Sequence, residues 1–301
     1  MLAYFRAPGG IFRIIKRTIQ DTSNDDCLGM AAQLAFYFFL ALFPALIFGV
    51  ALLGFLPVQG AIQPMLNRLS TIAPHDVVDI VGSQLKQLTS KGNTSLLTLG
   101  MLGAIWSCST AAVSIIDTLN RVHGIRESRP WWRVRLRAIL LMIGLVVFFL
   151  IAMLLVLAGP AVANRLDSSL HLGATVTTIW QVVRWIGAFI LTVLGVDIIY
   201  NFGPDAETKW VWITPGSLGA TILWIAGSVG FRIYIAHFGS YNATYGAIGG
   251  IIVLMLWFYI SGLSILIGAK LDSKIDEAVI EKRGILQPEG GKRRIGAALE
   301  S

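Results

Sequence analysis

The chain has 301 residues, of which 55% are hydrophobic and 14% are charged, and it carries a net charge of +7. A soluble globular domain has about a quarter charged residues, so this composition excludes an ordinary soluble protein. Its two cysteines, Cys27 and Cys108, form no recognisable spacing, and we expect neither a disulfide framework nor a bound metal or other cofactor.

Six stretches are long and apolar enough to cross a bilayer, which takes about 20 residues of helix. Each is too long for a strand and none alternates with a period of two, so helices are favoured over a barrel. We predict an all-α polytopic membrane protein with six transmembrane helices, at residues 28–56, 94–118, 136–162, 174–201, 211–237 and 245–269. They form a single helical membrane domain over 1–283, and a glycine-containing tail at 284–301 is predicted to be disordered.

Two segments outside the spans have the apolar spacing of amphipathic helices. Near the N-terminus, Phe12, Ile15 and Ile19 lie on the opposite side of a helix from the basic residues around them, which predicts a helix at the cytoplasmic membrane surface. In the first outer loop the same spacing occurs on both sides of Pro74, at Ile62, Met65, Leu66 and Leu69 and again at Val78, Val81, Leu85 and Leu88. We expect this outer segment to cap the bundle or to lie at the lipid headgroups.

The basic residues gather in alternate gaps between the spans. Eighteen Lys and Arg residues lie in the N-terminal segment, in the second and fourth gaps and in the C-terminal tail, against four in the opposite gaps. The positive-inside rule therefore places both termini in the cytoplasm. Because these residues lie where inserted helices need them, membrane lipid is the expected counter-charge and nucleic acid is not an expected partner.

Two arginines fall inside predicted spans, where a charge is costly and usually meets a partner or a wet cavity. Arg184 lies about ten residues into span four, and Arg232 lies nearer the outer end of span five. If these helices are neighbours, the two guanidinium groups form a candidate binding site for a phosphate or carboxylate. The alternative is that Arg232 reaches the membrane surface while Arg184 pairs with a buried carbonyl or carboxylate.

Two carboxylates close spans on the cytoplasmic side. Asp197 ends span four and Asp117 ends span two, and both are candidates for a proton or cation relay. Hydrogen bonding to a nearby backbone or to a loop arginine is the structural alternative. Gly246 and Gly250 in span six have GxxxG spacing and predict close helix packing, and an oligomer is possible.

The chain resembles the bacterial YihY/BrkB family of inner-membrane proteins, once labelled virulence factors and ribonuclease BN-like. The resemblance lies in AAQLAFYFFLALFPALI at 31–47, with Pro44 inside span one as a packing feature, in LGMLGAIWSCST at 99–110, in YNFGP at 200–204 and in TYGAIGG with LWFYISGLSILIGAKL at 244–271. The family usually has an acidic residue after the Gly-Ala of span six, where this chain has Lys270. Asp272 is the candidate replacement for that carboxylate.

The resemblance implies transport, including export of lipid or envelope components, beside the older ribonuclease label. The residues disfavour a nuclease, because His75, His123, His171 and His237 are isolated and no hydrolase motif occurs. We therefore expect no enzyme, but a transporter or flippase for an anionic lipid or envelope metabolite. The alternatives are a membrane scaffold or assembly factor and, third, a membrane enzyme.

Overall fold

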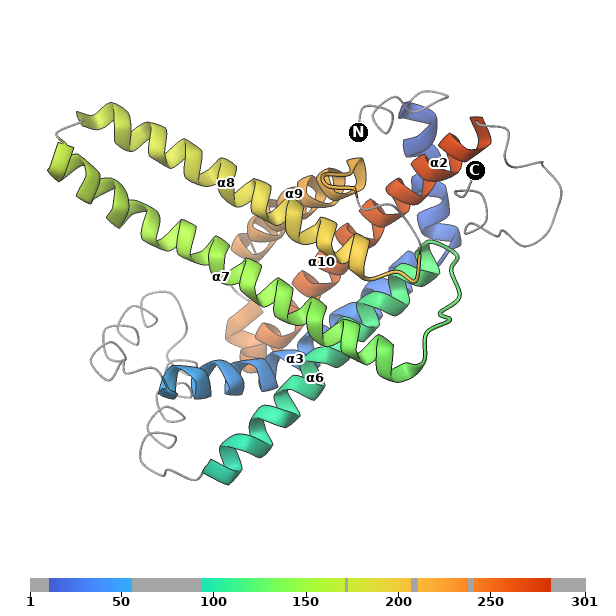
Figure 1. Ribbon diagram of the computed structural model, residues 1–301, viewed down its shortest axis with the longest axis horizontal. Helices are drawn as coiled ribbons and strands as arrows, with labels where there is room; N and C mark the ends of the chain where they lie inside the picture. Colours follow the sequence, from blue (N-terminus) through green and yellow to red (C-terminus); the bar gives the residue numbers. More distant parts are fainter. Residues whose placement is uncertain (1–10, 56–93, 171–172, 207–210, 238–240, 283–301) are drawn as a thin grey trace. The chain divides into compact units, whose positions relative to one another are not determined.

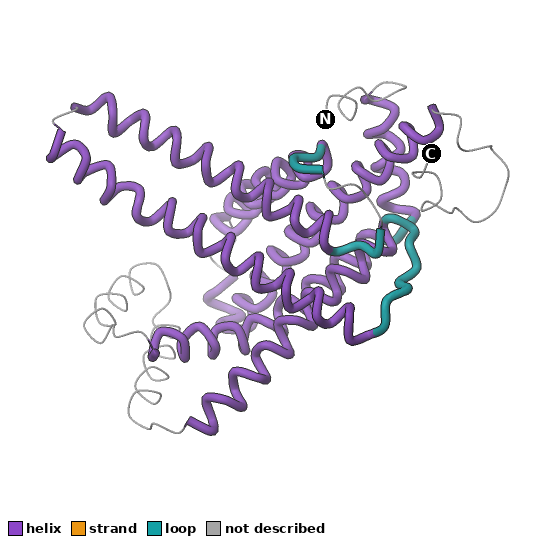
Figure 2. Tube along the Cα trace, in the orientation of Figure 1, coloured by secondary structure: helices purple, strands orange, loops and turns teal. Residues whose placement is uncertain are grey.

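The computed structural model describes residues 11–55, 94–170, 173–206, 211–237 and 241–282, which form seven helices (Figure 1). The helices are α2 (Ile11–Asn24), α3 (Cys27–Phe55), α6 (Thr94–Val122), α7 (Trp131–Leu170), α8 (Gly173–Phe202), α9 (Pro215–His237) and α10 (Tyr241–Lys282). Within these residues there is no strand, and Figure 2 shows the helices together with the described loops. Every helix except α2 is long and apolar enough to cross a membrane, which confirms the predicted class.

Two of the spanning helices extend well beyond the predicted apolar runs. Helix α7 has 40 residues and α10 has 42. Pro130 immediately precedes α7, and its carbonyl accepts hydrogen bonds from Arg133 N and Val134 N, so the helix starts before the apolar run begins. Hydropathy reports the part of a helix that suits lipid, whereas helix formation continues until a capping or breaking residue stops it.

The described residues belong to two compact units. Unit 2 covers Tyr37–Ala111, and unit 1 covers Met1–Phe36 and Ala112–Ser301, so α3 and α6 each contribute to both. In unit 2, Pro44 lies inside α3, as predicted, and the Cys108 thiol lies 3.6 Å from the carbonyl oxygen of Ala41. The amphipathic outer segment at 62–88 and the tail at 284–301 lie outside the described residues.

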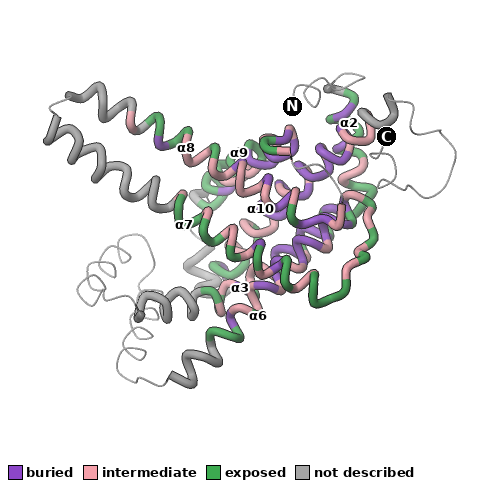
Figure 3. The backbone as a smooth tube through the Cα atoms, viewed as in Figure 1, coloured by how far each residue is buried: buried purple, intermediate pink, exposed green. Residues whose placement is uncertain are grey.

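Within unit 1, α7 packs along α8, α8 packs on α9, and α10 contacts both α9 and α2. Figure 1 shows α7 and α8 side by side as a long antiparallel hairpin. We call the region where α6 and α8 end and α7 and α9 begin the loop end of unit 1. Most of the fully buried side chains lie towards this end (Figure 3), including Leu119, Val122, Asp197, Ser217 and Leu266.

Helix α6 stops at the loop end through a glycine cap. Gly124 has a φ of 66°, a left-handed conformation that glycine adopts without a steric penalty. The Gly124 and Ile125 amides donate to the carbonyls of Arg121 and Asn120, and so satisfy oxygens that the ending helix leaves free. The chain is thereby turned back towards α7.

The N-terminal amphipathic helix is present as α2, which packs on α10. Ile14 and Thr18 are buried on one side of α2, while Ile15 and Ile19 remain exposed. The sequence spacing therefore identified the helix. It did not show that another face of α2 packs on α10, where Asp21 forms an ion pair with Lys274.

Candidate functional site

The start of α9 is the centre of a buried polar cluster. Thr214 is the N-cap residue, because its hydroxyl accepts the Ser217 amide hydrogen at 3.0 Å while its own amide donates to the Ser217 hydroxyl at 3.1 Å. Pro215 follows at the first helical position, where its missing N–H costs nothing. The sequence Thr-Pro-Gly-Ser thus forms a self-capped helix start.

Asp197 on α8 holds the backbone that leads into this start. Its carboxylate accepts hydrogen bonds from the Ile213 amide at 2.8 Å and the Thr214 amide at 3.3 Å. Ile213 has a φ of 57°, which is unfavourable for a β-branched residue and needs support from its surroundings. The Asp197 side chain is fully buried, so these backbone donors replace the water that a carboxylate would otherwise bind.

Asp272 on α10 reaches the same helix start from another side. It accepts a hydrogen bond from the Thr214 hydroxyl at 2.5 Å and one from the Gly216 amide at 2.7 Å. The Thr214 hydroxyl also lies 3.4 Å from an oxygen of Asp197. Asp197, Thr214 and Asp272, which we call the carboxylate cluster, therefore place two carboxylates around one hydroxyl at the positive end of a helix.

Two glycines allow this approach. A Cβ at Gly216 would overlap the Gly268 carbonyl and the Asp272 carboxylate, and a Cβ at Gly268 would overlap the Gly216 carbonyl and the Tyr200 hydroxyl. Any side chain at either position would push α9 and α10 apart. The Tyr200 hydroxyl donates to the Ile265 carbonyl at 2.6 Å and ties α8 to the same stretch of α10.

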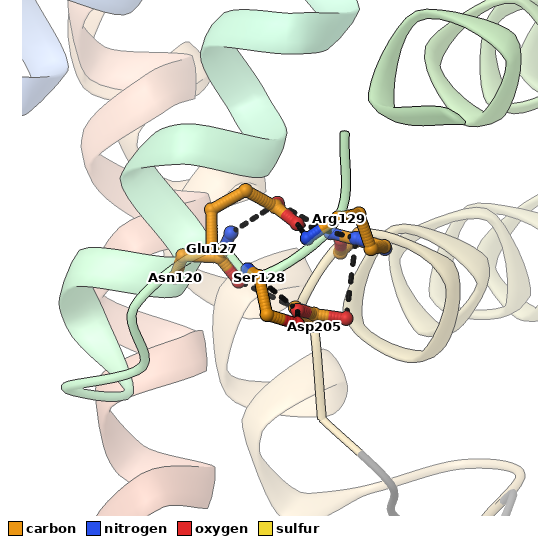
Figure 4. Close-up of polar contacts among 6 residues, drawn as sticks. Asn120, Glu127, Ser128, Arg129 and Asp205 are labelled. Atoms are coloured by element: carbon orange, nitrogen blue, oxygen red, sulfur yellow. Dashed lines mark hydrogen bonds and ion pairs between the residues drawn. The ribbon is translucent and has the colours of Figure 1, made fainter. Parts of the chain in front are cut away.

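A second polar network joins the α6–α7 loop to the α8–α9 loop (Figure 4). Arg129 donates to both oxygens of Glu127 at 2.6 Å and pairs with Asp205 at 3.2 Å. Asn120 donates to Glu127 at 2.8 Å and accepts from the Asp205 amide at 2.8 Å. The Ser128 amide and hydroxyl both donate to Asp205, at 3.0 and 2.5 Å.

The charges in this loop network stabilise each other. Hydrogen bonds from Arg129 hold the pKa of Glu127 below its usual range, although burial opposes this. Burial also opposes ionisation of Asp205, but hydrogen bonds from Ser128 and the charges of Arg129 and Arg137 lower its pKa overall. Glu127 reciprocally raises the pKa of Arg129. The network is therefore an ionised clamp at neutral pH.

Lys270 is buried at the loop end. Its ammonium pairs with Asp25, which lies between α2 and α3, and donates to the Val122 carbonyl at 3.3 Å, at the end of α6. One turn later, Lys274 pairs with Asp21 of α2 and lies 3.0 Å from Glu277. Lys270 thus joins three elements that meet at the loop end.

The predicted site residues lie in different surroundings. Arg184 is 9% exposed within α8, and its guanidinium lies 5.5 Å from the centre of the Trp185 ring. Arg232 is exposed on α9. Helices α8 and α9 do pack together, as the paired-arginine hypothesis requires.

The two predicted relay carboxylates also differ. Asp197 belongs to the carboxylate cluster, whereas Asp117 is a half-exposed surface residue that pairs with Arg121 at 2.8 Å on its own helix. A Cβ at Gly250 would meet no described atom within 4 Å, and the surroundings of Gly246 are outside the described side chains. Packing through these two glycines stays a prediction.

Sequence reasoning missed Thr214 and the Gly216–Gly268 approach as parts of a site, and it left the place of Asp272 open. The Thr-Pro-Gly-Ser string is a readable helix-start signal, but it does not reveal which carboxylates reach it. Among the described residues, no three His, Cys, Asp or Glu side chains group as metal ligands would. His75 and His171 lie outside that part of the chain.

Comparison with known proteins agrees with this architecture. The chain is 33% identical over 259 residues to the putative ribonuclease-like protein YfkH of Bacillus subtilis, which covers 86% of this chain and 92% of the relative. It is 27% identical over 289 residues to the UPF0761 membrane protein PSHAa0171 of Pseudoalteromonas translucida, and this match covers 91% of this chain and 88% of the relative. It is 26% identical to a UPF0761 membrane protein of Aeromonas salmonicida, and that match covers 92% of each chain. No solved structure matches the chain. The family model for virulence factor BrkB matches residues 18–290, and the chain belongs to this family of multi-pass membrane proteins.

Proposed function

We propose that this protein carries an anionic lipid or envelope metabolite across the bacterial inner membrane, as a transporter and not as an enzyme. The observation that carries the proposal is Arg184, an arginine that is 9% exposed inside a helix long and apolar enough to span the bilayer. Keeping a guanidinium at that depth costs several kcal/mol by order of magnitude, so such residues usually serve substrates or ions. A phosphate or carboxylate is the natural partner for its planar donors.

The orientation of the protein follows from its cations. We place the loop end and both termini in the cytoplasm, because Arg126, Arg129, Arg133 and Lys270 all lie at the loop end. Arg184 is thirteen residues from Asp197 along α8, which is about 20 Å of helix. Arg184 then lies in the outer half of the membrane, and the carboxylate cluster lies near the cytoplasmic surface.

The carboxylate cluster supplies a candidate for energy coupling. Two buried carboxylates that share one hydroxyl repel each other when both are ionised, and a single proton relieves that repulsion. Proton uptake or release at this cluster would change the support of the strained Ile213 backbone. We therefore assign Asp197 and Asp272 as coupling residues of the proposed transporter and give Asp117 no role in it.

Lipid movement in proteoliposomes tests the proposal directly. The probe is a fluorescent phosphatidylglycerol, and the measurement is the rate at which the label exchanges between leaflets. We expect wild-type protein to raise this rate, Arg184→Ala to return it to that of empty liposomes, and Arg184→Lys to retain part of it. Arg121→Ala is the matched control, because Arg121 is an exposed arginine in a surface ion pair. Equal exchange by wild type and Arg184→Ala would overturn the assignment.

A scaffold is the second candidate, and Gly250 favours it. Open space beside Gly250 in one chain leaves the predicted GxxxG face available to a helix of another chain. A scaffold would tolerate Arg184→Leu and would lose its partner on Gly250→Leu, as measured by co-purification from membranes.

A further inference from the structure

The first turns of α7 carry cations and exposed apolar side chains on one side of the helix. Arg133 and Arg137 are one turn apart, and Leu136, Leu140 and Ile143 continue the same side at helical spacing. Both arginines are exposed, and each of the three apolar residues is about half exposed. We propose that this side, which we call the α7 collar, binds one phospholipid with an anionic phosphodiester headgroup, in the leaflet that meets the loop end.

The positive charge of the α7 collar is not cancelled locally. Residues 126–137 contain five arginines and one carboxylate, Glu127, which is already engaged by Arg129. Among the described residues no carboxylate lies within ion-pair distance of Arg126 or Arg133. The charge of Arg137 helps to lower the pKa of Asp205, but Asp205 already pairs with Arg129. A phosphodiester would offset one of these positive charges, whereas a headgroup that also carries an ammonium would add a cation among arginines.

The collar is held in place before a lipid arrives. Ser128 and Arg129 are fixed by the loop network, and Pro130 accepts the first backbone hydrogen bonds of α7. Arg133 lies 5.1 Å from the centre of the neighbouring Trp132 ring, a cation–π arrangement that limits where its guanidinium can point. Ordering the protein side therefore costs little when the headgroup binds.

The apolar part of the collar identifies a lipid as the ligand, in preference to a soluble anion. Trp131 and Trp132 are 75% and 50% exposed, as is typical of aromatic residues at a membrane surface. Beyond them the exposed leucine and isoleucine side chains of the collar run along α7 for about two turns, so acyl chains can lie against them while the phosphate meets Arg133 and Arg137. Lipid binding at the collar involves neither Arg184 nor the carboxylate cluster, and it holds whether or not Arg184 binds a substrate.

Native mass spectrometry of the purified full-length protein tests the collar. The protein in detergent micelles is given equal amounts of phosphatidylglycerol and phosphatidylcholine with identical acyl chains, and the retained lipids are counted. We expect wild type to retain phosphatidylglycerol preferentially. Arg133→Gln/Arg137→Gln should reduce this preference at least tenfold and Arg133→Gln alone about fivefold, since a juxtamembrane arginine contributes on the order of 1 kcal/mol to anionic-lipid binding. Arg133→Lys/Arg137→Lys should retain most of it.

The matched control removes two exposed cations from α2, as Arg13→Gln/Lys16→Gln. We expect this variant to keep the wild-type preference for phosphatidylglycerol, because its two cations lie outside the collar. A general effect of positive charge would instead lower the preference of both double variants equally. The proposal is overturned if wild type retains both lipids alike, or if the α2 pair loses as much preference as the α7 pair. Either result leaves the proteoliposome test of Arg184 unaffected, so the two proposals fail separately.

Discussion

The loop end of unit 1 and the α7–α8 hairpin are stabilised in different ways. At the loop end, α8, α9 and α10 meet through backbone contact between glycines and through buried carboxylates that cap the start of α9. Along the hairpin, apolar side chains such as Leu140, Phe149 and Ile186 remain exposed. In a bilayer, little free energy is gained when an apolar side chain leaves the acyl chains and packs against protein. Close packing and hydrogen bonds must therefore hold the helices together. The loop end therefore fixes unit 1, whereas the hairpin is adapted to lipid contact.

Adding a methyl group at the loop end should lower the free energy of unfolding more than any other change considered below. Gly268→Ala places a Cβ against the Gly216 carbonyl and the Tyr200 hydroxyl, so α9 and α10 must separate, at a cost of about 3 kcal/mol. Gly250→Ala, in the same helix, meets open space and should be neutral or stabilise by up to about 1 kcal/mol. Unfolding in mixed detergent micelles gives both values. If the two variants had similar free energies of unfolding, α10 would not be more tightly packed at Gly268 than at Gly250.

Reversing the charge of Lys270 should have an intermediate effect. Lys270→Glu faces Asp25 and the Val122 carbonyl with a like charge, so we expect unfolding free energy to fall by about 2 kcal/mol. The double variant Asp25→Lys/Lys270→Glu restores an opposite pair and should recover at least half of that loss. No recovery in the double variant would show that the ion pair does not hold α10 to the turn before α3.

Acidification should have the smallest effect on stability, and we expect it to act through the carboxylates of the loop network. The pKa values of Glu127 and Asp205 are lowered in the folded protein, so their stabilisation is present above the ordinary carboxylate pKa of about 4 and is lost as pH falls through the folded values. Unfolding midpoints measured from pH 7 to pH 3 should therefore decline. Arg129→Gln removes the main cause of the Glu127 shift and should make the decline shallower; an unchanged slope would mean that other carboxylates control it.

Much of the fold could be predicted from sequence, because hydropathy reports directly on what lipid tolerates. All six predicted spans coincide with helices, and Pro44 lies inside α3 as expected. The lengths of α7 and α10 could not be read in the same way, because both helices continue into polar sequence. Asp272 was left without a place for this reason, since it follows the predicted end of span six while α10 runs on to Lys282.

The site was less predictable because depth along a span does not show which helices are neighbours. Asp197 and Asp117 both close spans in the sequence, yet one caps the start of α9 and the other pairs with Arg121 on the surface. The difference depends on the fold of the 211–214 segment, where Ile213 is left-handed. Lys270 is a similar case, since its partner Asp25 lies 245 residues away in the chain.

The groups that surround Arg184 in a membrane decide whether this arginine binds a lipid headgroup. A density map of the full-length protein in nanodiscs of phosphatidylglycerol would show what the buried guanidinium contacts. We predict a headgroup phosphate within hydrogen-bonding distance of Arg184, in a space open to the lipid beside α8. A sealed apolar bundle in which protein groups alone satisfy Arg184 would contradict it.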